Sequence, residues 1–194
     1  MFLVAGLGNP GEEYALTPHN LGFLTINRLA ELHGIRVNRR DSRAFMGVGE
    51  IDGHPVMLAQ PQTFMNLSGT SVAPLMQKHS VEPDRLVVVY DELDLPWRAL
   101  RIKPKGSAAG HKGMQSVIGS LHTSDLVRVR LGIHPGHPVD GAEFVLAPFK
   151  RSQMKDLEEF VDYGAGAVRS IIAEGVEKAM TKYNRRAPGL KEDE

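Results

Sequence analysis

An uninterrupted apolar run, Leu86-Val87-Val88-Val89-Tyr90, constrains the fold of this chain more than any other feature. β-branched and aromatic residues favour strands, and a strand without polar alternation is buried on both of its faces. Such a strand lies inside a sheet that is covered on either side. The run therefore predicts an α/β protein with a central strand at 86–90.

Strand and helix patterns alternate along the rest of the chain. Short apolar or alternating runs predict strands at 2–6, 44–51, 54–60, 98–103 and 127–134, the second and third joined by a turn at Asp52-Gly53. Helical spacing predicts helices near 20–34, 69–79, 112–121 and 157–172. No repeat or linker interrupts this order, so residues 1–186 are predicted to form one domain. Residues 187–194, which end in Lys-Glu-Asp-Glu, are expected to be a disordered tail.

Composition excludes several classes of protein. The chain has 194 residues, of which 42% are apolar, enough to bury one core. It has no cysteine, which excludes disulfides and thiol catalysis. It begins with a strand pattern where a secreted protein would carry a signal peptide, and no apolar run reaches membrane-spanning length. We therefore expect a cytoplasmic protein without a membrane partner.

The turn after the first expected strand, Gly6-Leu7-Gly8-Asn9-Pro10-Gly11, matches the G-x-G-x-x-G fingerprint of dinucleotide sites. In those sites a helix begins at the third glycine and its N-terminus binds phosphate. Here Pro10 removes a backbone donor, and Glu12 and Glu13 place two carboxylates where the phosphate would lie. A nucleotide-binding oxidoreductase is therefore a weak alternative.

Polar residues follow three expected strands. Asn9 and His19 lie in the segment after the first strand, although each can equally be a turn or capping residue. The segment Thr63-Phe64-Met65-Asn66-Leu67-Ser68-Gly69 follows the strand at 54–60, and Asp91-Glu92-Leu93-Asp94-Leu95-Pro96 ends the central strand in carboxylates. Since α/β sheets bind ligands at strand ends, these segments are predicted to form the functional site.

Together these motifs resemble bacterial-type peptidyl-tRNA hydrolases. The shared segments occur in the same order and spacing along nearly the whole chain: GLGNPG-xx-Y-xx-T-x-HN at 6–20, TFMNLSG at 63–69, DELDLP at 91–96, GHKG at 110–113, and the region 175–184. The resemblance implies a twisted mixed β-sheet covered by helices, with the site in a cleft beside the sheet edge. It also implies hydrolysis of the ester that joins a peptide to the terminal ribose of tRNA, by a monomer without a cofactor or an obligate protein partner.

Four residues fit the chemistry of ester hydrolysis. Water needs a positioned base, and an imidazole, whose ordinary pKa is roughly 6.5, is largely neutral near pH 7. His19 fits this base, and Asp91 fits the carboxylate that fixes its tautomer. Asn9 and Asn66 are neutral amides that can donate to the oxyanion or to the peptide main chain. The resemblance assigns all four positions in the same way.

The charge distribution suggests how the tRNA is held. The formal net charge is zero, yet residues 95–139 contain seven basic residues and one acidic residue. Such a local basic face suits a polyanion that touches the protein by one end, although Arg101 and Lys103 also alternate as on any half-exposed strand. The resemblance implies substrate contacts from Tyr14, Met65, Asn66, Arg101, Lys103, Lys112 and Arg130, with Lys103 and Arg130 on the terminal phosphate.

Lys112 departs from the family pattern. The family usually has Asn at this position of the GHN motif, and an ammonium donates hydrogen bonds but cannot accept one. The segment Thr17-Pro18-His19 also has Pro where a basic residue is common. A non-catalytic RNA-binding relative on the same fold is therefore a second alternative.

Two further expectations concern the surroundings of the site. No metal is expected, because the proposed reaction needs none. The alternative is Mg²⁺, which clustered carboxylates such as those of Asp91, Glu92 and Asp94 can bind. The Pro- and Gly-rich segment 135–149 is expected to be a long loop that can act as a lid.

Overall fold

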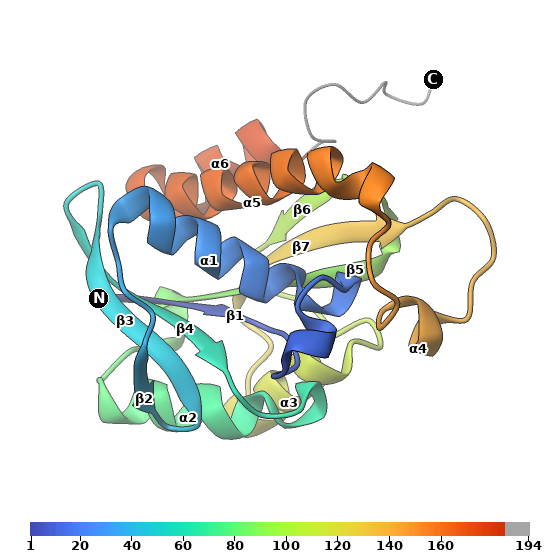
Figure 1. The fold of residues 1–194 in the computed structure, drawn as a ribbon. Coiled ribbons are helices and arrows are strands. Elements are labelled where there is room, and N and C mark those ends of the chain that lie inside the picture. Colours follow the sequence, from blue (N-terminus) through green and yellow to red (C-terminus); the bar gives the residue numbers. More distant parts are fainter. Residues whose placement is uncertain (185–194) are drawn as a thin grey trace.

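The computed structural model describes residues 1–184, so the tail expected at 187–194 lies outside the described residues. Within residues 1–184 seven strands form one sheet in the order β2-β3-β4-β1-β5-β7-β6 (Figure 1). Their bounds are β1 Phe2–Gly6, β2 Arg39–Asp41, β3 Ala44–Ile51, β4 His54–Pro61, β5 Leu86–Pro96, β6 Leu100–Lys103 and β7 Val127–His134. The central strands β4, β1, β5 and β7 are parallel, and the outer pairs are antiparallel. The expected mixed sheet is confirmed.

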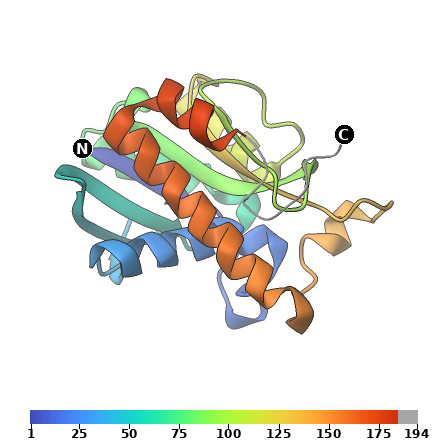
Figure 2. The ribbon, with the colours of Figure 1, turned by 90° about the horizontal axis from the view of Figure 1, so that it is seen from above.

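Helices cover both faces of this sheet. One face carries α1 (Leu21–His33), α5 (Met154–Glu174) and α6 (Val176–Tyr183), and α5 crosses over the strands (Figure 2). The other face carries α2 (Gly69–Lys78) and α3 (Lys112–Leu121). Of the residues described, no helix combines the length and apolarity needed to cross a membrane.

The central strand β5 contributes to both halves of the core, as the apolar run predicted. Val87 and Val89 pack in the cluster beneath α1 and α5, whereas Val88 and Tyr90 pack in the cluster beneath α2 and α3. The strand is longer than predicted, because Asp91 and Glu92 continue the pairing with β7 beyond the apolar run. Their polar side chains are thereby held on the rigid end of a buried strand.

Most other boundaries are confirmed to within a few residues. The hairpin of β3 and β4 turns at Asp52 and Gly53, which both have positive φ, 49° and 79°. Helix α1 ends at Gly34 in the left-handed conformation, with φ 63°. The strand expected to begin at 98 begins at Leu100 instead, because Arg98 has φ 70° and so lies in a turn.

The expectation of a continuous loop at 135–149 is wrong in part. This segment contains α4 (Gly141–Phe144), whose N-terminus is capped by the Asp140 carboxylate. A single helical turn has too few residues to produce a periodic pattern, which explains why it was not predicted. Two backbone hydrogen bonds also attach the end of the segment to the turn before α1. His19 N donates to the Val145 carbonyl at 2.9 Å, and Phe149 N donates to the Leu16 carbonyl at 2.8 Å.

Gly6 at the end of β1 and Gly22 in α1 allow these two elements to pack closely. A Cβ on Gly6 would lie 2.2 Å from the carbonyl oxygen of Gly22, and one on Gly22 would lie 2.4 Å from the Leu7 nitrogen. Strand β1 and helix α1 therefore approach backbone to backbone. Because α1 begins at Leu21, well beyond Gly11, this turn lacks the phosphate-binding helix of a dinucleotide site.

Candidate active site

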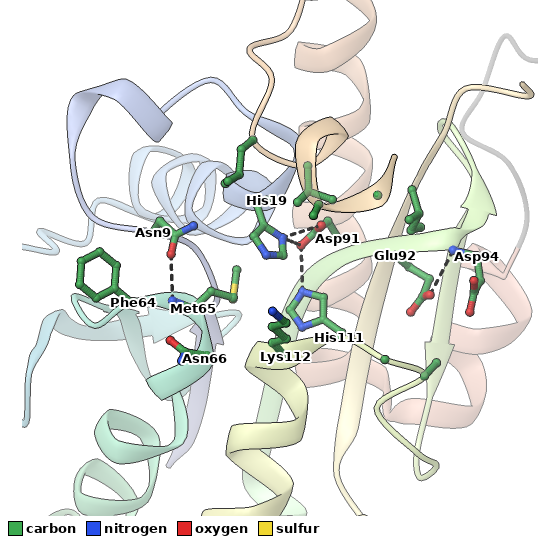
Figure 3. A pocket seen from close by; sticks show the side chains of 17 residues that line it. Asn9, His19, Phe64, Met65, Asn66, Asp91, Glu92, Asp94, His111 and Lys112 are labelled. Atoms are coloured by element: carbon green, nitrogen blue, oxygen red, sulfur yellow. Dashed lines mark hydrogen bonds and ion pairs between the residues drawn. The ribbon is translucent and has the colours of Figure 1, made fainter. Parts of the chain in front are cut away.

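A pocket of about 660 Å³ opens where the parallel strands β1, β4 and β5 end (Figure 3). Its walls come from the turns after β1 and β4, the end of β5, the start of α3, and the α4 segment. The predicted residues that line it are Asn9, His19, Met65, Asn66, Asp91 and Lys112. Segments that are far apart in the sequence therefore converge as expected from the positions of the strand ends.

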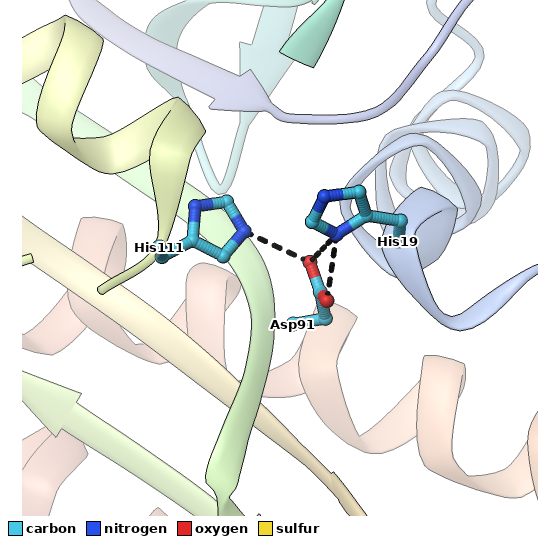
Figure 4. Close-up of side chains that lie close together, drawn as sticks. All are labelled: His19, Asp91 and His111. Atoms are coloured by element: carbon cyan, nitrogen blue, oxygen red, sulfur yellow. Dashed lines mark hydrogen bonds and ion pairs between the residues drawn. The ribbon is translucent and has the colours of Figure 1, made fainter. Parts of the chain in front are cut away.

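His19 and Asp91 form a hydrogen-bonded pair in this pocket. His19 Nδ1 lies 2.9 and 3.1 Å from the two carboxylate oxygens of Asp91, and Asp91 is only 2% exposed (Figure 4). Because an ionised carboxylate only accepts, Nδ1 carries the proton and Nε2 is the unprotonated nitrogen of neutral His19. The pair can therefore present a free base to the pocket.

Asp91 accepts a second hydrogen bond, from His111, which we did not single out from the sequence. His111 Nε2 lies 3.0 Å from Asp91 Oδ1, and His111 Nδ1 accepts from the backbone N–H of Met114 at 3.1 Å. His111 is the N-cap of α3, so the cap fixes its tautomer with the proton on Nε2. Its place between Gly110 and Lys112 in the GHKG motif was the one sequence signal available.

The environment of Asp91 keeps it ionised. Burial raises the pKa of its carboxyl. The imidazoles of His19 and His111 and the hydrogen bonds that they donate lower it by a larger amount, so the pKa lies well below its usual range. An acceptor that stays ionised at neutral pH holds the His19 ring in one orientation and stabilises it once it is protonated.

Asn9 is held with its amide donor available. Its Oδ1 accepts from the backbone N–H of Met65 at 2.8 Å, which leaves the Nδ2 hydrogens on the side that faces His19 (Figure 3). Its backbone is clamped by Asn20, which accepts from Asn9 N at 2.8 Å and donates to the Asn9 carbonyl at 3.0 Å. Asn20 is a buried positioning residue that the sequence reasoning did not identify.

The opposite wall is the turn after β4. Met65 is buried, with its carbonyl accepting from the Ser68 hydroxyl at 2.7 Å, whereas Asn66 is exposed beside it. Phe64 is 64% exposed at the rim. A fixed buried residue between two accessible ones suits contact with an extended substrate.

A family model described as Peptidyl-tRNA hydrolase matches residues 3–191. The chain belongs to the peptidyl-tRNA hydrolase family. It is 74% identical to the peptidyl-tRNA hydrolase of Solibacter usitatus over the full length of both, and 46% identical to that of Koribacter versatilis over 96% of this chain and 94% of the relative. The crystal structure of the Acinetobacter baumannii peptidyl-tRNA hydrolase is 33% identical and matches with a TM-score of 0.89 over 97% of each chain. The family and fold inferred from the motifs are confirmed.

The other residues that the peptidyl-tRNA hydrolase resemblance assigned to the substrate lie outside the pocket lining. Tyr14 contributes its carbonyl to the turn, accepting from Thr17 N and Oγ1 at 3.2 and 2.8 Å. Arg101 and Lys103 alternate with the buried residues Leu100 and Ile102 on edge strand β6. Both basic side chains therefore point away from the core beneath α5.

Strand β7 completes a basic face on that side of the sheet. Arg101 pairs in register with Arg130, and Lys103 with Arg128. Arg128 is fully buried and donates to the carbonyls of Leu126, Ser107 and Ser124, so its role is structural. Arg130 is 11% exposed, and its Nε lies 3.2 Å from Glu92 Oε2, whereas Lys103 is exposed. A phosphate contact by Arg130 would therefore have to share the guanidinium with Glu92.

His19, Asp91 and His111 offer ligand atoms within 4.8 Å of one another, a grouping that can hold a metal ion. These atoms hydrogen-bond one another, and the second nitrogen of His111 bonds Met114. Glu92, one of the carboxylates considered for Mg²⁺, accepts from Arg130 and from Asp94 N. This hydrogen-bond network suits proton transfer. That the reaction needs no metal ion stays a prediction.

Proposed function

We propose that this chain hydrolyses the ester of peptidyl-tRNA with water that the His19 and Asp91 pair activates. Membership of the peptidyl-tRNA hydrolase family supports the reaction. The observation that carries the mechanism is the hydrogen bond from His19 Nδ1 to a buried carboxylate, 2.9 Å long, inside the pocket. It leaves Nε2 as the base.

In the reaction, His19 Nε2 takes a proton from water while the water oxygen attacks the ester carbonyl carbon. Negative charge develops on the carbonyl oxygen, and the amide donors of Asn9 and Asn66 stabilise it. When the tetrahedral intermediate collapses, the bond from carbon to the ribose oxygen breaks and His19 returns its proton to that oxygen. The products are a peptide with a free carboxylate and a tRNA with a free terminal ribose.

The acceptor end of the tRNA would enter the pocket with its terminal phosphate on the basic face of β6 and β7. Strand β6 is two strands away from β5, roughly 10 Å at the usual strand spacing, which is within reach of a terminal nucleotide. Lys103 and Arg130 are the proposed phosphate contacts, with Arg101 beside them and Tyr14, Met65 and Asn66 nearer the ester. We further propose that the chain acts as a monomer in the cytoplasm.

The test is release of tRNA from an N-acetylated aminoacyl-tRNA by the natural chain and by His19→Ala. Removal of a general base should lower turnover by at least ~10²-fold while tRNA affinity stays nearly unchanged. Tight tRNA binding without hydrolysis by the natural chain would instead support the non-catalytic RNA-binding alternative. Wild-type turnover of a folded His19→Ala protein would remove His19 from the mechanism.

A further inference from the structure

Lys112 lies at a position that is unfavourable for the stability of its own helix. It is the first residue of α3, after the N-cap His111, and the first turn of α3 contains no acidic residue. A cation at a helix N-terminus meets the positive end of the helix dipole, whereas an acidic or neutral side chain is favoured there. A residue that breaks a local rule at a pocket wall indicates a role in the function of that pocket.

The other charges that line the pocket are largely compensated. Asp91 accepts from His19 and His111, and Glu92 pairs with Arg130. Asp94 is exposed and lies farther along β5, beyond Glu92 as seen from Lys112 (Figure 3). Lys112 therefore supplies the positive charge on the wall where His111 adjoins the ester-binding region.

The substrate of the proposed reaction differs from its nearest competitor by one charge. In peptidyl-tRNA the nitrogen on the carbon next to the ester carbonyl belongs to a neutral amide. In free aminoacyl-tRNA the same nitrogen is an amine, which is an ammonium when protonated. The carbonyl must lie near His19 Nε2 and Asn9 Nδ2 for hydrolysis, so this nitrogen also lies inside the pocket.

We propose that Lys112 is a specificity-determining residue that rejects free aminoacyl-tRNA by repelling its α-ammonium group. The inference rests on the proposed function and deepens it. Lys112 is exposed, so solvent screens its charge. Two positive charges about 6 to 8 Å apart, at an effective dielectric constant of about 40 to 80, repel each other enough to change a rate by roughly 2-fold to 10-fold. A neutral amide escapes this repulsion.

The experiment compares kcat/KM for an N-acetylated and a free aminoacyl-tRNA carrying the same amino acid, using the natural chain and Lys112→Gln. The ratio of the two values should fall by roughly 2-fold to 10-fold in Lys112→Gln, because hydrolysis of the free aminoacyl-tRNA rises. Lys105→Gln is the matched control, since Lys105 is exposed in the same basic segment but does not line the pocket. It removes the same charge and should leave the ratio unchanged.

The pH dependence of this ratio separates charge repulsion from a steric effect. An α-amino group deprotonates near or somewhat below pH 8, whereas a lysine ammonium persists to about pH 10. The ratio for the natural chain should therefore decline as pH rises from 6 to 9, and it should be flatter for Lys112→Gln. The other titratable groups of the pocket surround both substrates alike; they are His19, His111, Asp91, Glu92 and Asp94. Their titration therefore changes both rates to a similar extent and has little effect on the ratio.

The possible outcomes separate this role from others. Equal loss of both activities in Lys112→Gln would mean that Lys112 stabilises the oxyanion or binds tRNA, and an unchanged ratio would mean that it does not select substrates; either overturns the proposal. Failure of the natural chain to hydrolyse either substrate would overturn the proposed function itself. Lys112→Gln should unfold at the same temperature as the natural chain or at a higher one, because the substitution removes an unfavourable charge from the N-terminus of α3. Such a result would show that the change in ratio does not come from a loss of folding.

Discussion

The carboxylate of Asp91 and the imidazole of His111 are joined by a 3.0 Å hydrogen bond whose direction the backbone determines. His111 Nδ1 is occupied by the N–H of Met114, so only Nε2 can donate to Asp91. The second bond that Asp91 accepts comes from His19, the proposed base. The start of α3 thus orients the carboxylate that orients the base.

This relationship predicts different effects for two substitutions of His111. His111→Ala removes both the donor to Asp91 and the cap of α3, whereas His111→Asn keeps a good capping side chain but is too short to replace the donor. Turnover should fall roughly 10-fold to 100-fold in both, the size expected for one lost hydrogen bond to a charged group. Because only His111→Ala also removes the cap, it should be about 0.5 to 2 kcal/mol less stable than His111→Asn. Kinetics and urea unfolding measure the two effects, and full activity of His111→Asn would contradict the role assigned to the donor.

The basic face predicts a salt-dependent affinity for tRNA. Each phosphate contact contributes roughly 0.7 to 0.9 to the slope of log affinity against log salt concentration. Lys103→Ala combined with Arg130→Ala should lower the slope by up to twice this amount, with less than a full share from Arg130 because Glu92 holds it. Lys155→Ala, an exposed site on α5, serves as the control. If the double variant kept the natural slope, the face would be merely solvated.

Asp41 predicts an acid-dependent stability. Hydrogen bonds from His79 and then Lys78 lower the pKa of the Asp41 carboxyl from its ordinary 3.8 to about 2, and this carboxylate ties edge strand β2 to the end of α2. Because the folded pKa is the lower one, the stabilisation is present above about pH 4 and disappears as pH falls toward about 2. Asp41→Asn should lower the urea midpoint at pH 6 and flatten its decline between pH 4 and 2. Asp84→Asn, at an exposed site, should change neither, and identical acid profiles for the Asp41 variant and the natural chain would refute the prediction.

Two helical glycines predict effects of opposite sign. A Cβ on Gly22 would lie 2.4 Å from Leu7 N and 2.5 Å from Val89 O, both backbone atoms that cannot move aside. Gly22→Ala should therefore destabilise the protein by about 1 to 3 kcal/mol, despite the better helix propensity of Ala. A Cβ on Gly119 in α3 meets nothing within 4 Å, so Gly119→Ala should stabilise by about 0.4 to 1 kcal/mol. Urea unfolding of both variants tests the pair, and equal effects would show that packing does not decide them.

The sequence predicted the strands of the core well because burial on both faces leaves a continuous apolar run at 86–90 that few other structures produce. It also placed Asn9, Asn66 and Asp91 at strand ends, where the parallel sheet brings them together. It did not predict α4, because one helical turn has no periodicity, nor the polar extension of β5, because the pairing with β7 that sustains it is remote in sequence.

The amino-acid sequence by itself determined which chemical groups this chain possesses, the order of its main elements, and the family it resembles. The tertiary structure alone decided how those groups are connected. His19 and Asp91 are 72 residues apart and His111 lies 20 residues beyond Asp91, yet both imidazoles donate to one carboxylate. It also decided that Arg130 is paired with Glu92 whereas Lys103 is exposed. Hydrogen bonds form only when two atoms lie within about 3 Å of each other, and folding fixes such distances between segments that the sequence keeps apart.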